Sequence, residues 1–447
     1  MKSIQEVLKS IPVSRVALIT NNVEYSYTDI AMLEKSNEKT IQNLRGKNLV
    51  INGRSRTEFA LLLSLLDGIA SKILFLPSDI EHTLHEQYYQ QAEIHDEVFL
   101  ENGTLKTNNV TKKEPVKSKS CSGETEWIIP TSGTTNIPKL VSHTFSSLTK
   151  STKFNVELGG RYRWGLAFDI YRFSGIQVFL QSILSGSTLI VTDPSQSMSE
   201  MLALLIDKKC NALSATPSFW RKVLMTKESS ELELERITLG GEIADQNVLQ
   251  ALKQKFQNAK ITHIYASTEV GVGFSVTDGQ EGFPTSYLSG ELSDIQMKVD
   301  SDGLLWISPS RQGQKYLSSD KMYDENGYIN TGDLVEIRYD RVYFLGRDSG
   351  AINVGGNKVQ PEEVEQILLS SELTSAAYVY AMKNPMMGSL VCADVVMANE
   401  NSNKKEIKVQ LLKHCRENLE GFKVPAILKF VKQLKTTQSG KLERKLK

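Results

Sequence analysis

The stretch from Trp127 to Thr144 contains the residue types and spacing that best suggest chemistry. A short apolar run, Trp127 to Ile129, predicts a buried strand, and five small residues follow Pro130. Small residues let backbone N–H groups approach an anion, hydroxyls add donors, and Lys139 adds a positive charge. The pattern indicates phosphate binding, although plain turns share this composition. The five residues are Thr131, Ser132, Gly133, Thr134 and Thr135.

Together with Pro138 and Lys139, this loop resembles the phosphate loop of the adenylate-forming superfamily. That superfamily includes acyl-CoA synthetases, aryl-acid ligases, peptide-synthetase adenylation domains and firefly luciferase. The loop is not a Walker A motif, because Pro138 and Leu140 stand where that motif has Gly and then Ser or Thr. Further segments resemble the superfamily's motifs in the same order, so the resemblance covers nearly the whole chain.

The segment from Ile261 to Gly271 resembles the superfamily's Tyr-Gly-x-Thr-Glu motif. The resemblance implies that Tyr265 stacks on adenine, that Thr268 contacts the α-phosphate and that Glu269 holds Mg²⁺. An oxygen ligand suits Mg²⁺, which keeps substrate phosphates among its ligands. Upstream, Gly241 and Glu242 follow an apolar strand, where a glycine permits close approach of adenine and the acyl group.

Two later motifs complete the implied nucleotide site. Asp333 lies in a Thr-Gly-Asp element whose carboxylate, by the resemblance, accepts both ribose hydroxyls. Alone, this tripeptide would be read as a turn. Arg347 is implied to contact the nucleotide, and Ser349 takes the hinge position, where Asp or Lys is usual.

The C-terminal part carries two further implied elements. Gly355 and Gly356 resemble the glycine-rich segment that lines a pantetheine tunnel after the C-terminal domain rotates. Lys441 lies in Thr437 to Arg444, which resembles the superfamily's Thr-x-Ser-Gly-Lys-x-x-Arg motif, so it is implied to be the catalytic lysine.

The candidate acyl pocket is mostly apolar or aromatic, which favours an aryl or medium-length acyl group over an amino acid. Asp169 bears on the alternative, since amino-acid-activating members bind the substrate amine with an Asp after Phe. Its distance from Gly186 places it a few residues too early, so a turn or cap carboxylate is favoured. The pocket candidates are Tyr171, Gly241, Ile264, Ala266 and Val270.

The elements that must position these residues alternate between helix and strand. Residues 29–44 and 57–69 read as helices, and 49–51 and 73–76 as strands, which is the rhythm of a doubly wound α/β fold. From Ser289 the pattern changes to hairpins, with a turn at Asp302 and Gly303.

We therefore expect two domains. Residues 1–347 would form a large N-terminal adenylation domain of doubly wound mixed sheets with a β-rich subdomain. Residues 348–447 would form a small, mobile α+β domain that carries the catalytic lysine.

Composition is ordinary for a globular protein, and 52 basic residues balance 52 acidic ones, so no global field favours nucleic acid. The four cysteines form no Cys-x-x-Cys pair, which argues against a disulfide framework or zinc site. No signal peptide is evident, and no apolar run is long enough to span a bilayer. We expect a cytoplasmic protein.

The resemblance implies an ATP-dependent acid–thiol ligase. A carboxylic acid would be adenylated with release of pyrophosphate and then transferred to CoA or to the phosphopantetheine of a carrier protein. One alternative is a stand-alone amino-acid adenylation enzyme that loads a carrier protein. Another is a non-catalytic nucleotide-binding protein, which several departures from the superfamily pattern leave open: Asn136, Phe145, Ala266, Ser349 and Asn353.

Overall fold

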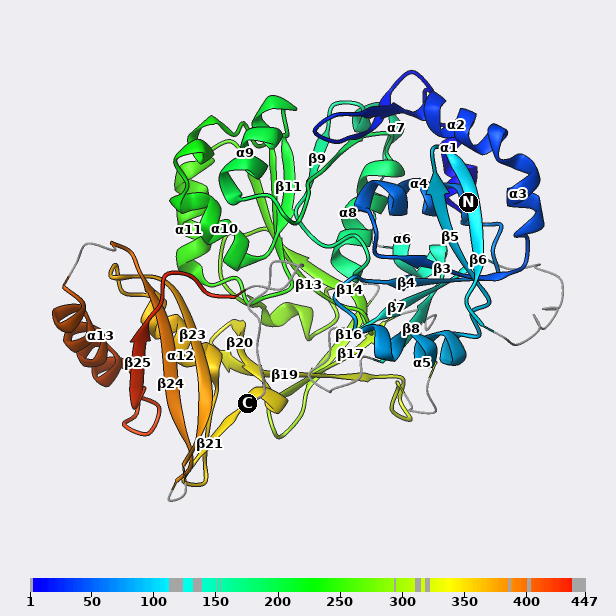
Figure 1. The fold of residues 1–447 in the computed structure, drawn as a ribbon. Coiled ribbons are helices and arrows are strands. Elements are labelled where there is room, and N and C mark those ends of the chain that lie inside the picture. Colours follow the sequence, from blue (N-terminus) through cyan, green and yellow to red (C-terminus); the bar gives the residue numbers. More distant parts are fainter. Residues whose placement is uncertain are drawn as a thin grey trace.

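The computed structural model describes residues 3–111, 124–131, 139–150, 152, 154–292, 295–309, 315–317, 322–384, 387–399 and 403–435. Across these ranges the strands form four sheets (Figure 1). Two large sheets account for most of the first three hundred residues, an antiparallel sheet follows, and the fourth sheet lies in the C-terminal part. This confirms the expected α/β class of large mixed sheets, followed by a β-rich part and by a C-terminal part that contains both helices and strands.

One large sheet contains the strands on either side of the candidate phosphate loop. Its strand order is β18-β8-β7-β4-β3-β5-β6. The β3·β4, β3·β5 and β4·β7 pairs are parallel, whereas β7 and β8 are antiparallel. The strands are β3 (Asn48–Asn52), β4 (Lys72–Leu76), β5 (Asp96–Glu101), β6 (Thr104–Asn109), β7 (Glu126–Pro130), β8 (Leu140–His143) and β18 (Lys315–Tyr316).

The other large sheet has the order β14-β13-β12-β11-β9-β10-β1-β2. It is parallel from β13 to β1 and antiparallel at both edges. Its strands are β1 (Val16–Ile19), β2 (Glu24–Ser26), β9 (Arg163–Leu166), β10 (Thr188–Val191), β11 (Ala212–Ala215), β12 (Arg236–Gly240), β13 (Lys260–Ser267) and β14 (Gly271–Val276).

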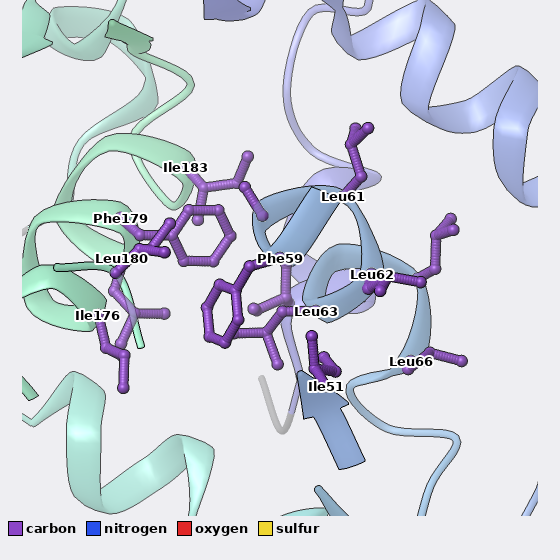
Figure 2. Packing of buried hydrophobic residues seen from close by; sticks show 14 of the residues in the cluster. Ile51, Phe59, Leu61, Leu62, Leu63, Leu66, Ile176, Phe179, Leu180 and Ile183 are labelled. Carbon is purple, nitrogen blue, oxygen red and sulfur yellow. The ribbon is translucent and has the colours of Figure 1, made fainter. Parts of the chain in front are cut away.

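Helices α4 (Arg56–Leu66) and α8 (Phe173–Ile183) pack in a core shared by both large sheets. Nearly every residue of α4 is buried, as expected for a helix that is apolar on all sides. Figure 2 shows Phe59 and Leu63 of α4 facing Phe179 and Leu180 of α8. Burial of side chains of this size contributes about 1.5–3 kcal/mol each.

The remaining helices cover the outer faces of the large sheets or connect their strands (Figure 1). They are α1 (Ile4–Leu8), α2 (Tyr27–Ser36), α3 (Glu38–Asn43), α5 (His82–Ala92), α6 (Phe145–Thr149), α7 (Val156–Gly159), α9 (Met198–Asp207), α10 (Pro217–Met225), α11 (Gln246–Lys255), η1 (Lys227–Glu231) and η2 (Thr285–Tyr287).

Two predicted helices differ from those observed. The helix expected over 29–44 is divided at Asn37, whose buried side chain donates to the carbonyl of Gly103 (3.0 Å) and accepts from Leu105 N (2.7 Å). These contacts tie the chain to the β5–β6 turn. The helix expected over 57–69 ends at Leu66, and Asp67 is extended there.

The third sheet is antiparallel in the order β15-β20-β19-β17-β16. The hairpin around Asp302 and Gly303 is confirmed as β16–β17. The Thr-Gly-Asp element lies inside β19, not in an isolated turn, and Gly332 takes a φ of 72° there. The strands are β15 (Phe283–Pro284), β16 (Ile295–Val299), β17 (Leu304–Pro309), β19 (Ile329–Arg338) and β20 (Arg341–Arg347).

The C-terminal sheet has the order β22-β21-β24-β23, with β25 paired to β24. Helix α12 (Pro361–Leu369), beside this sheet, contacts the preceding part through Gln366, whose amide donates to the Glu281 carboxylate at 2.9 Å. No helix in the described residues is long and apolar enough to cross a membrane. The elements are η3 (Asp348–Gly350), β21 (Ile352–Val354), β22 (Asn357–Val359), α12 (Pro361–Leu369), β23 (Thr374–Asn384), β24 (Gly388–Met397), α13 (Lys404–Asn418) and β25 (Ile427–Phe430).

Candidate active site

Thr131 and Lys139 mark the two ends of the candidate phosphate loop. The amide of Thr131 donates to the carbonyl of Lys139 at 2.8 Å, and the amide of Lys139 donates to the Thr131 hydroxyl at 3.2 Å. These bonds hold the ends together at the last residues of β7 and the start of β8. The other four predicted phosphate-binding residues, Ser132 to Thr135, lie outside the described residues, as does Lys441.

Thr268 and Glu269 lie in the short connection between β13 and β14. Ser267 pairs with Gly271 at the end of the ladder, and the amide of Val270 donates to the Ser267 hydroxyl at 3.1 Å. Gly271 has a φ of 78°, a conformation that other residues adopt only with strain. The two predicted catalytic residues are therefore presented on a tight, closed turn.

His143, at the end of β8, touches this turn and was not among the predicted site residues. Its Nε2 lies 2.7 Å from the carbonyl oxygen of Thr268 and its Nδ1 3.3 Å from the Ser147 hydroxyl. The side chain is fully buried, and this burial lowers its pKa to about 4 although the bond to Thr268 raises it. A histidine inside a short apolar strand was the available sequence signal, but its partner lies 125 residues away.

Asp333 is the centre of a second polar group. The Tyr265 hydroxyl donates to Asp333 Oδ2 at 2.5 Å, and Arg347 Nε forms an ion pair with Oδ1 at 2.9 Å. Asp333 and Arg347 are directly opposite each other in the β19–β20 ladder, which explains their pairing. The predicted ribose, adenine and nucleotide contacts thus come together in one place.

The charges around Arg347 connect this group to the Thr268 turn. Desolvation alone would lower the pKa of the half-exposed Arg347 guanidinium, but the negative charges of Asp333 and Glu269 raise it. Glu269 is therefore within electrostatic range of Arg347. Burial, with the neighbouring Asp333 charge, also raises the pKa of Tyr265 well above its usual value of 10, so its hydroxyl stays protonated and donates.

The Tyr265 ring is held by aromatic neighbours. It lies nearly parallel to Phe274 of β14 and Phe344 of β20, with ring centroids 5.2 Å away in each case. Stacking of this kind fixes the ring more firmly than burial alone. Its stacking on adenine stays a prediction.

The predicted glycine contact and its neighbour follow β12. Gly241 has a φ of 81°, and the Glu242 carboxylate accepts from the amide of Ser218 at 2.9 Å, at the start of α10. Gly240 pairs with Ile264 in the β12–β13 ladder, so Gly241, Ile264 and Ala266 lie on neighbouring strands. Their role in an acyl pocket stays a prediction, as does that of Val270, which is buried.

Tyr171 occupies a different environment from these pocket candidates. Its hydroxyl donates to the carbonyls of Asn52 (2.9 Å) and Ser55 (3.2 Å), and its ring lies 4.5 Å from that of Phe59. These contacts place it in the core beside α4. Asp169 accepts from the Tyr171 amide at 3.2 Å, which is the turn geometry that the sequence favoured.

The residues predicted to act in domain rotation lie just beyond β20. Ser349 is exposed within η3, directly after Arg347 and Asp348. Gly355 and Gly356 form the turn between β21 and β22, with φ values of 59° and 92°. A Cβ atom on Gly355 would lie 2.7 Å from the terminal methyl of Met387, so this turn is closely packed against β24.

Glu269 has a side-chain carboxylate, a kind of ligand that binds Mg²⁺. In the described part of the chain no three His, Cys, Asp or Glu side chains cluster as a metal cage. Mg²⁺ does not need one, since it binds through one or two carboxylates and takes its remaining ligands from phosphate and water. Glu269 would supply such a carboxylate beside the end of the phosphate-loop strands.

Comparisons with known proteins identify the family. Residues 65–314 match the model of the AMP-binding enzyme family, and residues 363–441 match that of the AMP-binding enzyme C-terminal domain. The chain is 23% identical over 430 residues to 2-succinylbenzoate–CoA ligase of Listeria innocua serovar 6a, covering 93% of this chain and 87% of that one. It is 26% identical over 361 residues to D-alanine–D-alanyl carrier protein ligase of Staphylococcus aureus, covering 75% and 73%.

A solved structure shares the fold across nearly the whole chain. The anthranilate CoA ligase AuaEII in complex with anthranoyl-AMP superimposes with a TM-score of 0.79 at 16% identity, covering 98% of this chain and 95% of that one. The family match spans more than half of the sequence and continues into its C-terminal part. The chain therefore belongs to the AMP-binding enzyme family, within the adenylate-forming superfamily.

Proposed function

We propose that this enzyme joins a carboxylic acid to a thiol through an acyl-AMP intermediate. The acid's carboxylate attacks the α-phosphorus of ATP, forming the acyl–O–P bond and releasing pyrophosphate. The sulfur of a thiol then attacks the acyl carbon, the thiol gives up its proton, and AMP leaves. Adenylation is needed because oxide is a prohibitive leaving group, whereas AMP is a stable phosphate monoester.

The observation that carries this proposal is the meeting of three distant segments. The phosphate-loop strand β8 contacts the Thr268 turn through His143, and Tyr265, three residues earlier, contacts Asp333. Arg347 closes the group from β20. In a chain of this family, such convergence supports an intact nucleotide site and argues against a decayed nucleotide-binding protein.

Each residue has a task that its chemistry fits. Asp333 would accept the ribose hydroxyls, and residues 131–135 with Lys139 would hold the β- and γ-phosphates. Thr268 and Lys441 would stabilise the charge that develops on the α-phosphoryl oxygens. Mg²⁺ held by Glu269 would neutralise phosphate charge.

The second half-reaction would use the C-terminal part. We place the division between the domains at residues 347 and 348, with Ser349 as the hinge and Gly355 and Gly356 beside the pantetheine arm. Rotation of the C-terminal domain would move Lys441 away from the acyl carbon and bring the thiol to it. Domain movements of this kind commonly limit turnover.

For the substrate we propose an aryl acid, with CoA as the acceptor. The relative from Listeria innocua is named for 2-succinylbenzoate, and the similar solved structure contains anthranoyl-AMP. The pocket candidates Ile264, Ala266 and Val270 are apolar, which suits an aromatic ring. An amino acid loaded onto a carrier protein is the second candidate, favoured by the relative named for D-alanine.

Among the described residues, Cys210, Cys392 and Cys415 are buried and form no disulfide, which fits the reducing cytoplasm that we propose as the setting.

The test is acid-dependent ATP–pyrophosphate exchange over a panel of 2-succinylbenzoate, anthranilate, benzoate, medium-chain fatty acids and D- and L-amino acids. Lys441→Ala should lower exchange at least about a hundredfold, because the lysine stabilises developing charge. Lys435→Ala, an exposed lysine shortly before it, is the matched control and should retain activity. Exchange with no acid, despite ATP binding, would refute the ligase proposal.

A further inference from the structure

His143 makes the contact that joins the phosphate-loop strand to the Thr268 turn. A carbonyl oxygen can only accept, so the bond to Thr268 requires the proton on His143 Nε2. The ring is fully buried and lies 5.9 Å from that of Phe173 at the start of α8. With no exposed edge, it has no direct access to a substrate.

We propose that His143 is a positioning residue that sets the orientation of Thr268 and Glu269 relative to β8, the strand that follows the phosphate loop. This inference rests on the proposed function, because it holds that the His143–Thr268 hydrogen bond serves the catalytic roles proposed for Thr268 and Glu269.

The bond acts on the peptide unit that places Glu269. The carbonyl of Thr268 and the amide of Glu269 belong to one planar unit, so fixing the oxygen fixes the direction in which the Glu269 backbone continues. The turn is otherwise held by the Val270 amide on Ser267, which lies on its own strand. His143 therefore supplies a tie from outside the β13–β14 hairpin.

The ring is itself held from the opposite side. With the proton on Nε2, its Nδ1 can only accept, and it lies 3.3 Å from the Ser147 hydroxyl. That hydroxyl accepts from the Thr144 amide at 2.9 Å in the capping box of α6. The first turn of the helix after β8 thus orients the imidazole. Oxygen positions near a reacting phosphate matter, because misplacement by about 1 Å can cost about a hundredfold in rate.

Two amide substitutions separate positioning from simple burial. The amide nitrogen of His143→Gln can reach the place of Nε2 and donate to Thr268, whereas that of His143→Asn falls near the place of Nδ1 and cannot. The variants bury similar polar groups, so a difference between them reports on the bond. His263→Leu is the matched control, because it removes a different histidine bond, to the Gln280 carbonyl (3.0 Å), from β13, the strand that leads into the Thr268 turn.

The first readout is hydrogen exchange of the peptide that contains residues 268–270, and the second is kcat and KM for ATP in pyrophosphate exchange. We expect His143→Asn to exchange faster in this peptide and to lose about tenfold to a hundredfold in kcat. His143→Gln should stay within about threefold of wild type. His263→Leu should leave this peptide and kcat unchanged.

Equal behaviour of the Asn and Gln variants in this peptide would overturn the inference, as would faster exchange spread evenly over the chain in His143→Asn. A wild-type protein without pyrophosphate exchange would refute the proposed function instead. The hydrogen-exchange comparison would still decide whether His143 holds the turn.

Discussion

Asp67 and Asp333 show how differently two regions of this enzyme treat a carboxylate. Asp67, at the end of α4, is fully buried and accepts from the amide of Ile4 (2.7 Å) and from the indole N–H of Trp127 (2.9 Å). Asp333 lies on β19, an inner strand of the third sheet, between Arg347 and the hydroxyl of Tyr265. The first region has neutral donors and the second has a cation.

The donors around each carboxylate determine whether it is available to a ligand. Burial raises the pKa of Asp67 to about 7, so below that pH the folded protein holds the carboxyl mostly protonated. Its bonds to Ile4 and Trp127 tie α1 and β7 to α4. Asp333 has a guanidinium at 2.9 Å, and one of its partners is a hydroxyl that a ribose hydroxyl can replace. We therefore expect substitutions at Asp67 to change stability and those at Asp333 to change nucleotide use.

The largest effect is expected for Asp333→Ala. The variant would lose the hydrogen bonds from the two ribose hydroxyls of ATP to the charged Asp333 carboxylate. At about 1.5–3 kcal/mol for each bond, this loss should lower kcat/KM for ATP by about 10²- to 10⁴-fold. Urea unfolding should change little, because Arg347 is half exposed and can return to solvent. Asp340→Ala, in the exposed turn of the same hairpin, is the control. Unchanged KM and kcat in Asp333→Ala would remove the ribose assignment.

Asp67 should make stability fall as pH rises. Its pKa of about 7 in the folded protein exceeds the ordinary value of 3.8, so the folded state binds the extra proton between those values. The extra proton on Asp67 stabilises the folded state fully below about pH 4, and this stabilisation is lost as pH rises through 7. The free energy of unfolding should fall by about 2 kcal/mol from this source between pH 5 and pH 7.

Urea unfolding of wild type and Asp67→Asn across this range measures the effect. The amide of Asp67→Asn cannot titrate, so the free energy of unfolding of this variant should fall less steeply between pH 5 and pH 7 than that of wild type. Other titrating groups contribute equally to both proteins. Parallel curves would mean that Asp67 is ionised in the folded protein. ATP-dependent activity at pH 8 should be similar in both, in contrast to the Asp333 variant.

The same two regions show how far the sequence leads. The strands at 49–51, 73–76 and 127–129 and the 297–307 hairpin follow from local apolar patterns and turn residues, and the structure confirms them. The Thr-Gly-Asp element gave no local sign of a strand, because β17 and β20 on either side supply its ladder. Resemblance, rather than periodicity, pointed to Asp333.

Contacts between distant segments account for what the sequence did not reveal. The break at Asn37 depends on residues 66 and 68 positions away, and the role of His143 depends on a carbonyl 125 positions away. Neither residue type is unusual for its local pattern. Such effects arise only when the fold brings the partners together, so they follow from packing and not from propensity.

The smallest effect is expected for Tyr265→Phe, which tests whether the tyrosine hydroxyl competes with a ribose hydroxyl for Asp333. It removes the hydroxyl that occupies Asp333 Oδ2 and keeps the ring between Phe274 and Phe344. If a ribose hydroxyl must displace this donor, its removal should lower KM for ATP by about twofold to tenfold, the worth of one net hydrogen bond of about 0.5–1.5 kcal/mol. Adding Asp333→Ala to this variant should abolish the gain, because the two hydroxyls compete for one carboxylate. A higher KM in Tyr265→Phe would instead mean that the tyrosine orients Asp333 for the ribose, and the Asp333 group would then resemble the Asp67 group in being a fixed internal network.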